Sequence, residues 1–325
     1  MKMSFNEKKV VVTGAAGFIG SNLTDKLLEM GAEVIGIDNL YSGRLENLEE
    51  AKKNKNFQFF KGDIRDFNFL IDIFTNVDII YHEAAFTSVP QSILMPESCN
   101  DVNVNGTLNI LNAARKKDVE KVVFASSASV YGDLPTLPKK EDMQRLPKSP
   151  YGVSKLACES YFQVYNQVYG LNTTCLRYFN VFGPRQRDSP YSGVIAIWLG
   201  RIIRNESLLI YGDGENSRDF TYVKDVIQAN ILACQHDASG EILNISCNHP
   251  INLIELAKLM LKLTGKEELK IEYTDPRPGD ITHSYGDVSK AKKMIKFEPK
   301  YNQEEGLRDY FIWYRKKYKI DLDVQ

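Results

Sequence analysis

An apolar run that leads directly into a glycine-rich turn constrains the fold of this chain more than any other stretch. Residues Lys8 to Thr13 are mostly apolar and β-branched, which is typical of a buried parallel strand. Glycines follow at Gly14, Gly17 and Gly20, and Ser21 to Met30 then carry leucines at helical spacing. Such a turn lets the backbone approach a pyrophosphate at the helix N-terminus, where N–H groups and the helix dipole attract negative charge. The alternative is that the glycines serve only the conformation of the turn.

An acidic residue after the second predicted strand supports the dinucleotide interpretation. The strand Glu33 to Ile37 ends at Asp38, about 20 residues beyond the turn, where a carboxylate can accept hydrogen bonds from an adenosine ribose. A carboxylate there would also repel a 2′-phosphate, so the sequence favours NAD over NADP. Arg44 lies close by in the sequence and could bind a phosphate, which keeps NADP as the alternative.

Strands and helices alternate through the first half of the chain. Further strands are predicted at Phe57 to Lys61, Val77 to Tyr81, Lys121 to Ala125 and Thr173 to Arg177, and Asp101 to Lys117 has the apolar stripe of a long amphipathic helix. This order predicts an α/β fold with a doubly wound, Rossmann-like parallel sheet. Ligands of such sheets bind beyond the carboxyl ends of the strands.

Residues after two of these strands are suited to contacts with a dinucleotide. Asp63 could contact adenine, with a helix cap as the alternative. Ala84 and Ala85 are small enough for the backbone to lie along the dinucleotide. His82 is interpreted as a packed or solvated histidine, because no second metal-binding residue has a suitable spacing, and no metal site is predicted.

Tyr151 and Lys155 form a candidate acid/base pair. They lie four residues apart at the start of a predicted helix that continues to about Tyr169, so they share one helix face. An ammonium beside a phenol favours the phenolate, so Tyr151, with a free pKa of about 10, is predicted to serve as a base near neutral pH. Tyrosine and lysine are also common on exposed helix faces, and a purely structural pair is the alternative.

The composition favours a small-molecule partner over nucleic acid or membrane. The 325 residues allow a large domain with a smaller lobe, and 41 basic residues nearly balance 42 acidic ones. Five cysteines without a CxxC spacing indicate neither a disulfide framework nor a zinc site. No segment reaches the roughly 20 apolar residues of a membrane span, and no secretory signal precedes the first strand. We therefore expect a cytoplasmic protein.

A series of motifs covers nearly the whole chain in order. They are TGAAGFIGS at 13–21, DN at 38–39, GDI at 62–64, NVNGT at 103–107, SSASVYG at 126–132, SPYGVSK at 149–155, LRYFNVFGPRQ at 176–186, GDGENSRDFTYVKD at 212–225 and PRPGDITHSYGD at 276–287. Together they resemble the extended short-chain dehydrogenases/reductases, and among these the NAD-dependent UDP-hexose 4-epimerases, with UDP-N-acetylglucosamine 4-epimerases nearest.

The resemblance implies roles for individual residues. Tyr151 is the expected catalytic base, Lys155 its activator and a ligand of the nicotinamide ribose, and Ser127 the hydroxyl that orients the sugar oxygen. Ser126 or Ser129 remains an alternative to Ser127. NAD is the expected cofactor, and its expected contacts are Gly14, Gly17, Phe18, Ile19, Asp38, Asn39, Ser42, Gly43, Asp63, Ile64, Ala84, Ala85, Asn103, Tyr151, Lys155 and Tyr178.

The regular alternation of strands and helices ends near Asn180. We place an NAD-binding domain at 1–179 and a nucleotide-sugar-binding lobe at 180–325, with about 220–235 crossing back to the domain. Arg218 and Arg277 would clamp a diphosphate, because guanidinium presents paired donors, with surface ion pairs as the alternative. Trp198 is expected either near the uracil or in the core. The expected substrate contacts are Ser88, Ser127, Ala128, Tyr151, Asn180, Val194, Trp198, Tyr211, Arg218, Arg277, Asp280 and Ser284.

Two short stretches bear on the reaction and the sugar. Related 4,6-dehydratases carry Thr-Asp-Glu where this chain has Ser127 to Ser129, and without that acid pair the chain fits 4-epimerisation. Ser284 stands where the family places a bulky tyrosine in enzymes confined to UDP-glucose and UDP-galactose, so its small size predicts activity on the N-acetylated pair as well. Ser284 could instead be an ordinary loop residue. A nucleotide-sugar dehydratase, a related enzyme or a non-catalytic NAD sensor remains the alternative function.

The resemblance also implies an oligomeric state. Residues Tyr161 to Val168 make the helix after Lys155 apolar around much of its surface. In this family, that helix and the one near 103–117 pair with their copies in a four-helix bundle, so a homodimer is expected.

Overall fold

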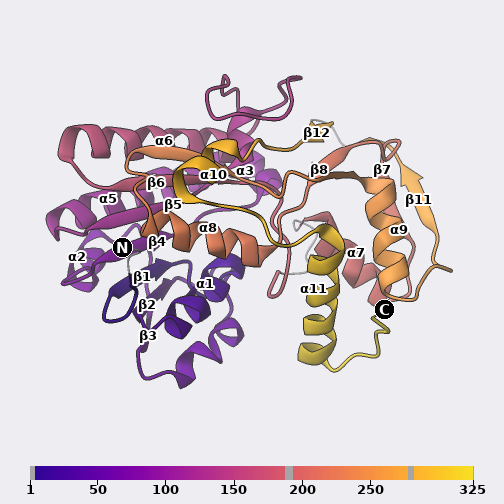
Figure 1. Cartoon of the computed structure of the whole chain (residues 1–325), viewed down its shortest axis with the longest axis horizontal. Coiled ribbons are helices and arrows are strands. Elements are labelled where there is room, and N and C mark those ends of the chain that lie inside the picture. The colour runs from indigo at the N-terminus through magenta and orange to yellow at the C-terminus, as the bar shows by residue number, and fades with distance from the viewer. Residues whose placement is uncertain (1–3, 187–192, 277–281, 325) are drawn as a thin grey trace.

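The main domain is built on one parallel sheet. The computed structural model describes residues 4–186, 193–276 and 282–324, and its seven-stranded sheet has the order β3-β2-β1-β4-β5-β6-β9 (Figure 1). The strands are β1 (Lys9–Thr13), β2 (Glu33–Asp38), β3 (Phe57–Lys61), β4 (Ile79–His82), β5 (Lys121–Ser127), β6 (Thr173–Tyr178) and β9 (Glu241–Ile245). The strand order reverses between β1 and β4, which is where a doubly wound sheet opens a crevice for ligands. The predicted fold class is confirmed.

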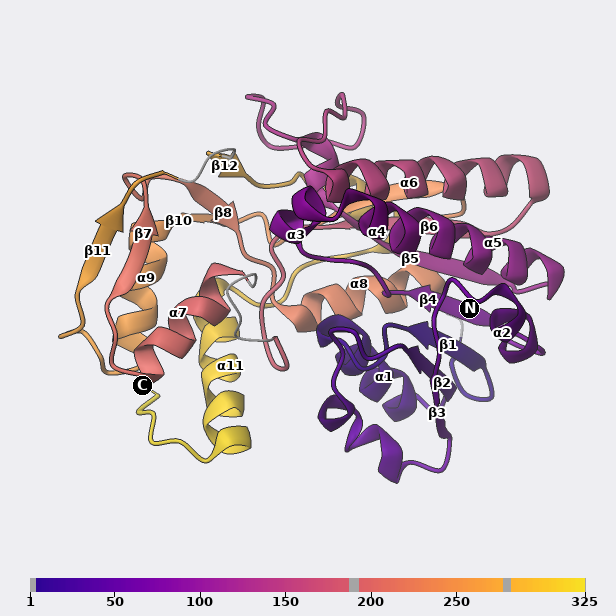
Figure 2. The same ribbon diagram turned by 180° about the vertical axis from the view of Figure 1, so that it is seen from behind.

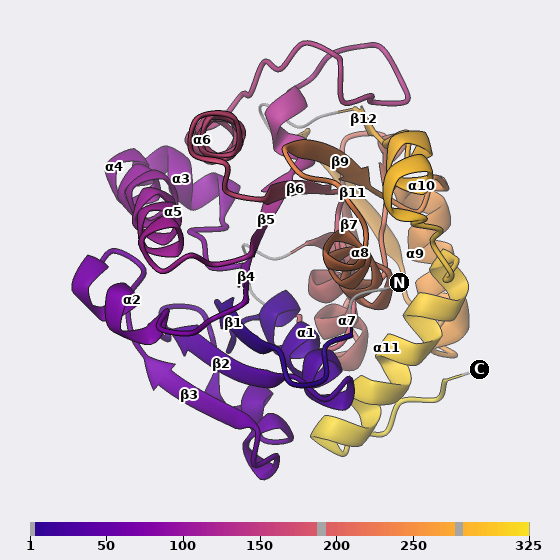
Figure 3. The ribbon, with the colours of Figure 1, turned by 60° about the vertical axis from the view of Figure 1, so that its left-hand side comes forward.

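Helices cover both faces of this sheet. Figure 3 shows α4, α5 and α6 on one face and α1 and α8 on the other. Because both faces are covered, β1, β4 and β6 are buried along almost their whole length. The helices of this domain are α1 (Phe18–Glu29), α2 (Phe67–Ile73), α3 (Val89–Leu94), α4 (Pro96–Asn100), α5 (Gly106–Lys116), α6 (Pro150–Tyr169), α8 (Val223–Gln235) and α10 (Ser289–Ile295).

A smaller lobe lies beside the carboxyl ends of the strands. It contains a three-stranded sheet, β10-β8-β12, and a two-stranded sheet, β11-β7, with helices packed around them (Figure 2). Its elements are α7 (Val194–Ile203), β7 (Leu208–Tyr211), β8 (Ser217–Asp219), β10 (Pro250–Asn252), α9 (Leu253–Leu263), β11 (Ile271–Thr274), β12 (His283–Ser284) and α11 (Gln303–Tyr318). None of the helices in the described ranges is long and apolar enough to cross a membrane.

The chain returns to the main sheet more often than its pattern predicts. Besides α8, which we expected to cross back, β9 pairs with β6 as the seventh strand and α10 packs against β9. We did not predict β9, because it follows the point where the regular alternation ends and carries the polar Asn244 in its buried part. Asn244 is tolerated there because its amide bonds the backbone oxygens of Lys139 and Asp287.

Two helix boundaries differ from the sequence prediction. The first helix begins at Phe18 instead of Ser21, so Gly20 belongs to its first turn. The helix predicted at 101–117 begins with a π-helical turn, Asp101–Asn105, and continues as α5. This wider turn follows α4 without a break, so a single helical rod runs from Pro96 to Lys116.

Candidate active site

The glycine-rich turn after β1 packs against the end of β4. Gly14 has a φ of +68°, and a Cβ atom on it would lie 2.8 Å from the backbone nitrogen of Ala84. A Cβ atom on Gly20 would lie 2.2 Å from the carbonyl oxygen of Gly14. Only glycine therefore allows this closed turn, and Gly17, Phe18 and Ile19 begin α1 directly behind it. Backbone at a helix N-terminus with no side chains in the way fits the pyrophosphate of a dinucleotide.

Asp38 lies at the carboxyl end of β2, next to this turn. Its carboxylate accepts hydrogen bonds from the backbone N–H groups of Ala16 at 3.0 Å and Leu40 at 2.7 Å. Burial raises the pKa of Asp38, and these two bonds oppose the rise. A Cβ atom on Gly43 would lie 2.7 Å from the same carboxylate. Each oxygen accepts more than one bond, so the carboxylate keeps capacity for a ribose hydroxyl.

The residues predicted for the adenine end of the cofactor lie together. The amide of Asn39 donates to Asp63 at 2.9 Å, and Arg65 forms an ion pair with Asp63 that holds the pKa of its carboxyl well below the usual range. The cap of α2 is Asp66, so the capping role considered for Asp63 belongs to its neighbour. Ser42 is exposed in the loop after β2.

Two other predicted cofactor residues make structural contacts. Ile64 is buried, and a Cβ atom on Gly106 would lie 2.6 Å from its side chain, so these residues join β3 to α5. The amide of Asn103 is buried between the backbone of Phe86 and the hydroxyl of Ser154, to which it donates at 2.8 Å. Any influence of Asn103 on a cofactor therefore passes through the segment after β4.

Ser127, Tyr151 and Lys155 are brought together by β5 and α6. Ser127 is the last residue of β5, and α6 begins with Ser149 as its cap and Pro150 in its first turn. The Lys155 ammonium donates to the backbone oxygen of Ala125 at 2.6 Å and lies 5.8 Å from the centroid of the Tyr151 ring. The predicted triad therefore shares one place at the carboxyl edge of the sheet.

Burial opposes the ionisation of Tyr151 on which its predicted role as a base depends. Burial raises the pKa of its phenol to about 12, and a hydrogen bond with Ser127 opposes this rise. Burial likewise lowers the pKa of the Lys155 ammonium. In the protein alone the phenol is therefore protonated near neutral pH, and the role of Tyr151 as a base stays a prediction.

The three serines at the end of β5 have different surroundings. The hydroxyl of Ser126 is buried and donates to Glu159 at 2.5 Å. The hydroxyl of Ser129 is buried without a partner, and that of Ser127 accepts a bond from the backbone of Ser129. Ser127 alone of the three is hydrogen-bonded to Tyr151, which favours it over the two alternatives.

A buried ion pair behind the triad was not predicted. Arg177 of β6 binds Glu159 of α6 through two hydrogen bonds of 2.8 Å, and both side chains are fully buried. The same guanidinium donates to the hydroxyl of Tyr131 at 2.7 Å, which in turn donates to Asn244 of β9. This network joins α6 to β5, β6 and β9. Its sequence signal is a glutamate four residues after Lys155 on the same helix face.

Glu83 and Ser92 are further side chains that the sequence did not identify. Glu83, directly after β4, accepts a hydrogen bond of 2.9 Å from the hydroxyl of Tyr178 at the end of β6. Burial raises the pKa of Glu83 to about 7. The buried hydroxyl of Ser92 in α3 accepts the backbone N–H of Tyr151 and so supports the start of α6.

His82 is a packed histidine, one of the two roles that the sequence indicated. It is buried, and its ring nitrogens lie 2.8 Å and 2.9 Å from the hydroxyls of Thr13 and Thr107. Burial and the charge of Lys155 lower its pKa to about 3, so the ring is neutral. Across the described ranges, no group of three His, Cys, Asp or Glu side chains is arranged to hold a metal ion.

On the substrate side, Arg218 and Ser284 are neighbours. They pair across the parallel strands β8 and β12, and the Arg218 guanidinium donates to the backbone oxygens of Ser217 and Thr282. Asn180 is exposed where the chain leaves the main domain, and its amide donates to the backbone of Asp219 in β8. Three predicted contacts thus gather around β8.

The other predicted substrate contacts are more scattered. Trp198 is 1% exposed and its indole donates to the backbone of Leu209, which is the core role considered for it. Ser88 is the cap of α3, and Ala128 begins a 3-10 turn after β5. Val194 starts α7 and Tyr211 ends β7. Arg277 and Asp280 lie outside the described residues.

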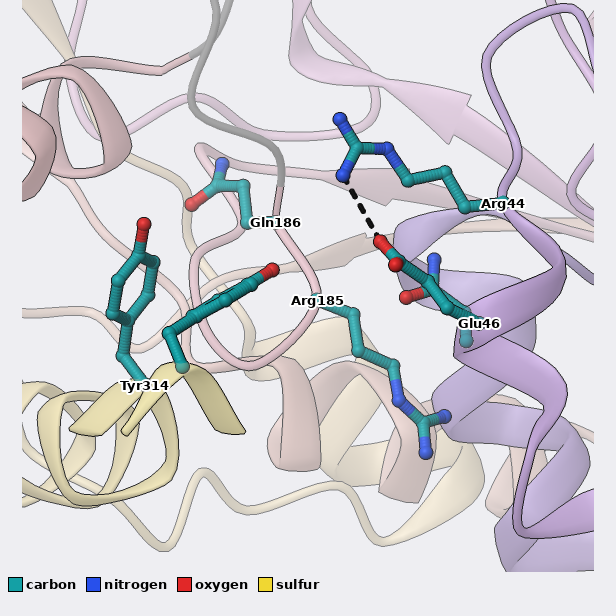
Figure 4. A pocket seen from close by; sticks show the side chains of 7 residues that line it. Arg44, Glu46, Arg185, Gln186 and Tyr314 are labelled. Carbon is teal, nitrogen blue, oxygen red and sulfur yellow. Dashed lines mark hydrogen bonds and ion pairs between the residues drawn. The ribbon is translucent and has the colours of Figure 1, made fainter. Parts of the chain in front are cut away.

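A cavity of about 190 Å³ lies where the lobe meets the main domain (Figure 4). Figure 4 shows Arg44 and Glu46 on one side of it and Tyr314 of α11 on the other. Both lining arginines are already paired, Arg44 with Glu46 at 2.9 Å and Arg185 with Asp25 at 2.5 Å. The cavity therefore lies at the junction of the lobe and the domain, and each of its lining arginines already has a carboxylate as its counter-charge.

Comparison with known proteins agrees with this geometry. The family model of GDP-mannose 4,6 dehydratase matches residues 11–310. A putative UDP-glucose 4-epimerase of Methanocaldococcus jannaschii is 39% identical over 94% of this chain and 97% of the relative. The structure of UDP-N-acetylglucosamine 4-epimerase from Methanobrevibacter ruminantium, in complex with UDP-N-acetylmuramic acid, has a TM-score of 0.92 and 40% identity, covering 96% of this chain and 99% of that one.

A further solved structure bears on the cofactor. UDP-glucose 4-epimerase of Thermus thermophilus, in complex with NAD, has a TM-score of 0.86 and 36% identity, covering 94% of this chain and 99% of that chain. The predicted family is confirmed by these comparisons. The chain belongs to the GDP-mannose 4,6-dehydratase family of extended short-chain dehydrogenases/reductases and, within it, groups with the UDP-sugar 4-epimerases, which are isomerases.

Proposed function

We propose that this chain is an NAD-dependent UDP-sugar 4-epimerase that interconverts UDP-N-acetylglucosamine and UDP-N-acetylgalactosamine, and also UDP-glucose and UDP-galactose. The relatives named above support the reaction class. The glycine turn, Asp38 and the small residues after β4 fit NAD, which when bound would accept a hydride from C4 of the sugar and return it. The positive charge of its oxidised ring would also favour ionisation of the Tyr151 phenol.

The observation that carries the proposal is the set of groups around Ser127. A hydroxyl, a phenol and an ammonium meet there, and Ala128 and Ser129 follow where a dehydratase would carry carboxyl groups. The nearby carboxylates are engaged elsewhere, Glu159 with Arg177 and Glu83 with Tyr178. The site is therefore equipped to move one proton to and from a sugar hydroxyl, and the carboxyl groups described near it are engaged and do not offer a second acid for the expulsion of water.

The residues divide the proton chemistry between them. Tyr151 takes the proton of the 4-hydroxyl as the C4 hydrogen leaves as hydride, which yields a 4-keto sugar. Ser127, hydrogen-bonded to Tyr151, holds the sugar oxygen within reach. Lys155, fixed by the backbone oxygen of Ala125, stabilises the phenolate form in which Tyr151 accepts that proton. Return of the hydride to C4 from the opposite face of the ketone, with return of the proton to the 4-oxygen, would complete the inversion.

The sugar assignment rests on Ser284. Its half-buried side chain stands beside Arg218 across β12 and β8, the side of the lobe where we place the diphosphate and sugar. A serine leaves more volume than a tyrosine, and the difference is large enough to admit an acetamido group.

The decisive experiment incubates the full-length protein with UDP-N-acetylglucosamine, without added cofactor, and separates the nucleotide sugars. We expect UDP-N-acetylgalactosamine to form, and Tyr151→Phe to slow its formation about 10²- to 10⁴-fold because the proton acceptor is lost. Conversion of UDP-glucose alone would leave the reaction intact and refute the role of Ser284. A 4-keto-6-deoxy product would replace the epimerase by a dehydratase, and no reaction with NAD supplied would leave a non-catalytic NAD-binding protein.

A further inference from the structure

Glu83 lies at the carboxyl edge of the sheet, beside two predicted cofactor contacts, Ala84 and Tyr178. It follows β4 and precedes Ala84, whose backbone packs against the Gly14 turn. Its carboxylate accepts a hydrogen bond of 2.9 Å from the hydroxyl of Tyr178, and that hydroxyl accepts a hydrogen bond of 2.7 Å from the amide of Asn230 in α8. Because the Tyr178 hydroxyl has only one proton and donates it to Glu83, it can only accept from Asn230.

Glu83 and Lys155 approach the end of β5 from opposite faces of the sheet. The bond from Asn230 links Glu83 to the α8 face, whereas Lys155 extends from α6 on the other face (Figure 3). The negative charge of Glu83 raises the pKa of Lys155, and the charge of Lys155 lowers that of Glu83, so each acts on the other without direct contact. Within the described residues, no cation lies within ion-pair distance of Glu83.

The other titratable groups near Glu83 are neutral at physiological pH. Burial raises the pKa of Tyr178, Tyr81 and Cys234, and His82 has a pKa of about 3. Tyr151 and Cys158 likewise have raised pKa values. Lys155 and Glu83 are therefore the charges that a nicotinamide ring at this edge would meet.

We propose that Glu83 is the residue that sets the preference of this protein for oxidised over reduced cofactor. The nicotinamide ring carries a positive charge in NAD⁺ and none in NADH. A carboxylate beside Tyr178 stabilises the charged form, whereas the Lys155 ammonium acts in the opposite sense. This inference rests on the NAD-dependent function proposed above. An epimerase needs NAD⁺ at the start of each turnover, so Glu83 would offset the bias of Lys155 towards NADH.

The preference should depend on pH with a defined sign. Burial raises the pKa of Glu83 to about 7, so its carboxylate is charged above that pH and neutral below it. A bound NAD⁺ favours the charged form and lowers this pKa, so NAD⁺ binding below neutral pH is accompanied by proton release. The ratio of the NADH to the NAD⁺ dissociation constant should therefore rise as the pH rises through neutrality.

The test measures both dissociation constants for the nucleotide-free, full-length protein, with NADH followed by its fluorescence and NAD⁺ by competition. Glu83→Gln keeps an acceptor for Tyr178 and removes the charge. At pH 8.5 we expect it to lower the ratio of the two constants at least about tenfold, the effect of one charge at any distance below about 12 Å through an effective dielectric constant of about 20. At pH 5.5 the variant and the natural protein should agree. Glu272→Gln, on an exposed residue of β11, is the matched control and should change neither constant.

Equal ratios for the natural protein and Glu83→Gln at pH 8.5 would refute the proposal. If the variant does not fold, the natural protein alone still tests the proposal. A ratio of the NADH to the NAD⁺ dissociation constant that stays constant from pH 5.5 to 8.5 would exclude a titrating carboxylate at the nicotinamide ring. These measurements contain no sugar. A tenfold effect without sugar conversion would therefore leave this inference standing while the epimerase proposal fails, and failure of both nucleotides to bind would end both.

Discussion

At the scale of single residues, burial sets the chemistry of this site more than spacing does. The pKa of Tyr151 is about 12 and that of Glu83 about 7, and in both cases removal of water is the largest cause. The positive charge of Lys155 lowers the pKa of Glu83, yet desolvation of the carboxyl exceeds this effect. The bound cofactor and substrate are therefore expected to complete the activation of Tyr151.

Sugar selection is tested at a single residue, Ser284. Ser284→Tyr should lower kcat/KM for UDP-N-acetylglucosamine at least about tenfold and leave UDP-glucose within about twofold, because the added ring fills space that the acetamido group needs. The measurement is the ratio of the two kcat/KM values. Ser284→Ala is the control and should keep both activities. Equal losses on both sugars for the tyrosine variant would place the selectivity elsewhere.

At the scale of elements, the Glu159–Arg177 pair fixes α6 to the central strands. The pair lies one helical turn beyond Lys155, and Ser126, the neighbour of Ser127, bonds to the same carboxylate. One buried group thus holds the helix that carries the base and the strand that carries the serine. Such a pair contributes little to the net free energy of unfolding, because the cost of removing both charges from water offsets their attraction. We therefore expect its main effect to be the alignment of α6 with β5 and β6.

Removal of one charge of this pair should be costly. Glu159→Gln leaves Arg177 buried without a counter-charge, so we expect a loss of about 3–5 kcal/mol in the free energy of unfolding, measured with urea. The matched control is Glu304→Gln, which breaks an exposed ion pair with Arg308 on α11 and should cost less than about 1 kcal/mol. Similar losses of unfolding free energy in the two variants would show that burial does not make the Glu159–Arg177 pair more costly to break than an exposed pair.

At the scale of the whole molecule, α6 presents an apolar stripe to solvent. Val153, Tyr161, Val164 and Val168 follow one another along its outer face, and Val168 is 65% exposed. Their spacing places them on one side of the helix, opposite the residues that pack on the sheet. We propose that a second copy of this chain covers the stripe, with α5 and α6 of both copies forming a four-helix bundle.

A charge in this stripe should separate the copies. Val164→Asp combined with Val168→Asp is expected to convert a dimer of 37.0 kDa chains into a monomer, because two carboxylates would be buried in the interface without partners. Light scattering after size-exclusion chromatography measures the mass. Tyr273→Asp, on an exposed residue of β11, should leave the mass unchanged. A natural protein that is already monomeric at micromolar concentration would refute the dimer.

Local features made the main domain predictable from its sequence. The strands β1 to β6 have apolar runs, the helices between them have apolar stripes, and the glycine turn and the Tyr151–Lys155 spacing are short-range patterns. β9 was not predicted, because it carries the buried polar Asn244 and joins the sheet only through its pairing with the distant strand β6. The hydrogen bonds of Asn103 with Phe86 and Ser154 were not predicted either, because a sequence motif identifies a residue but not its partners in the fold.

The sequence by itself determined the doubly wound sheet, the dinucleotide turn and the pairing of a tyrosine with a lysine, because each depends on residues that are close in the chain. Only the tertiary structure decided the bond between Glu83 and Tyr178, the burial that raises the pKa of Tyr151, and the placement of Ser284 beside Arg218. These features join residues from distant segments. Their energies come from desolvation and contact, which exist only when the sheet and the lobe have come together.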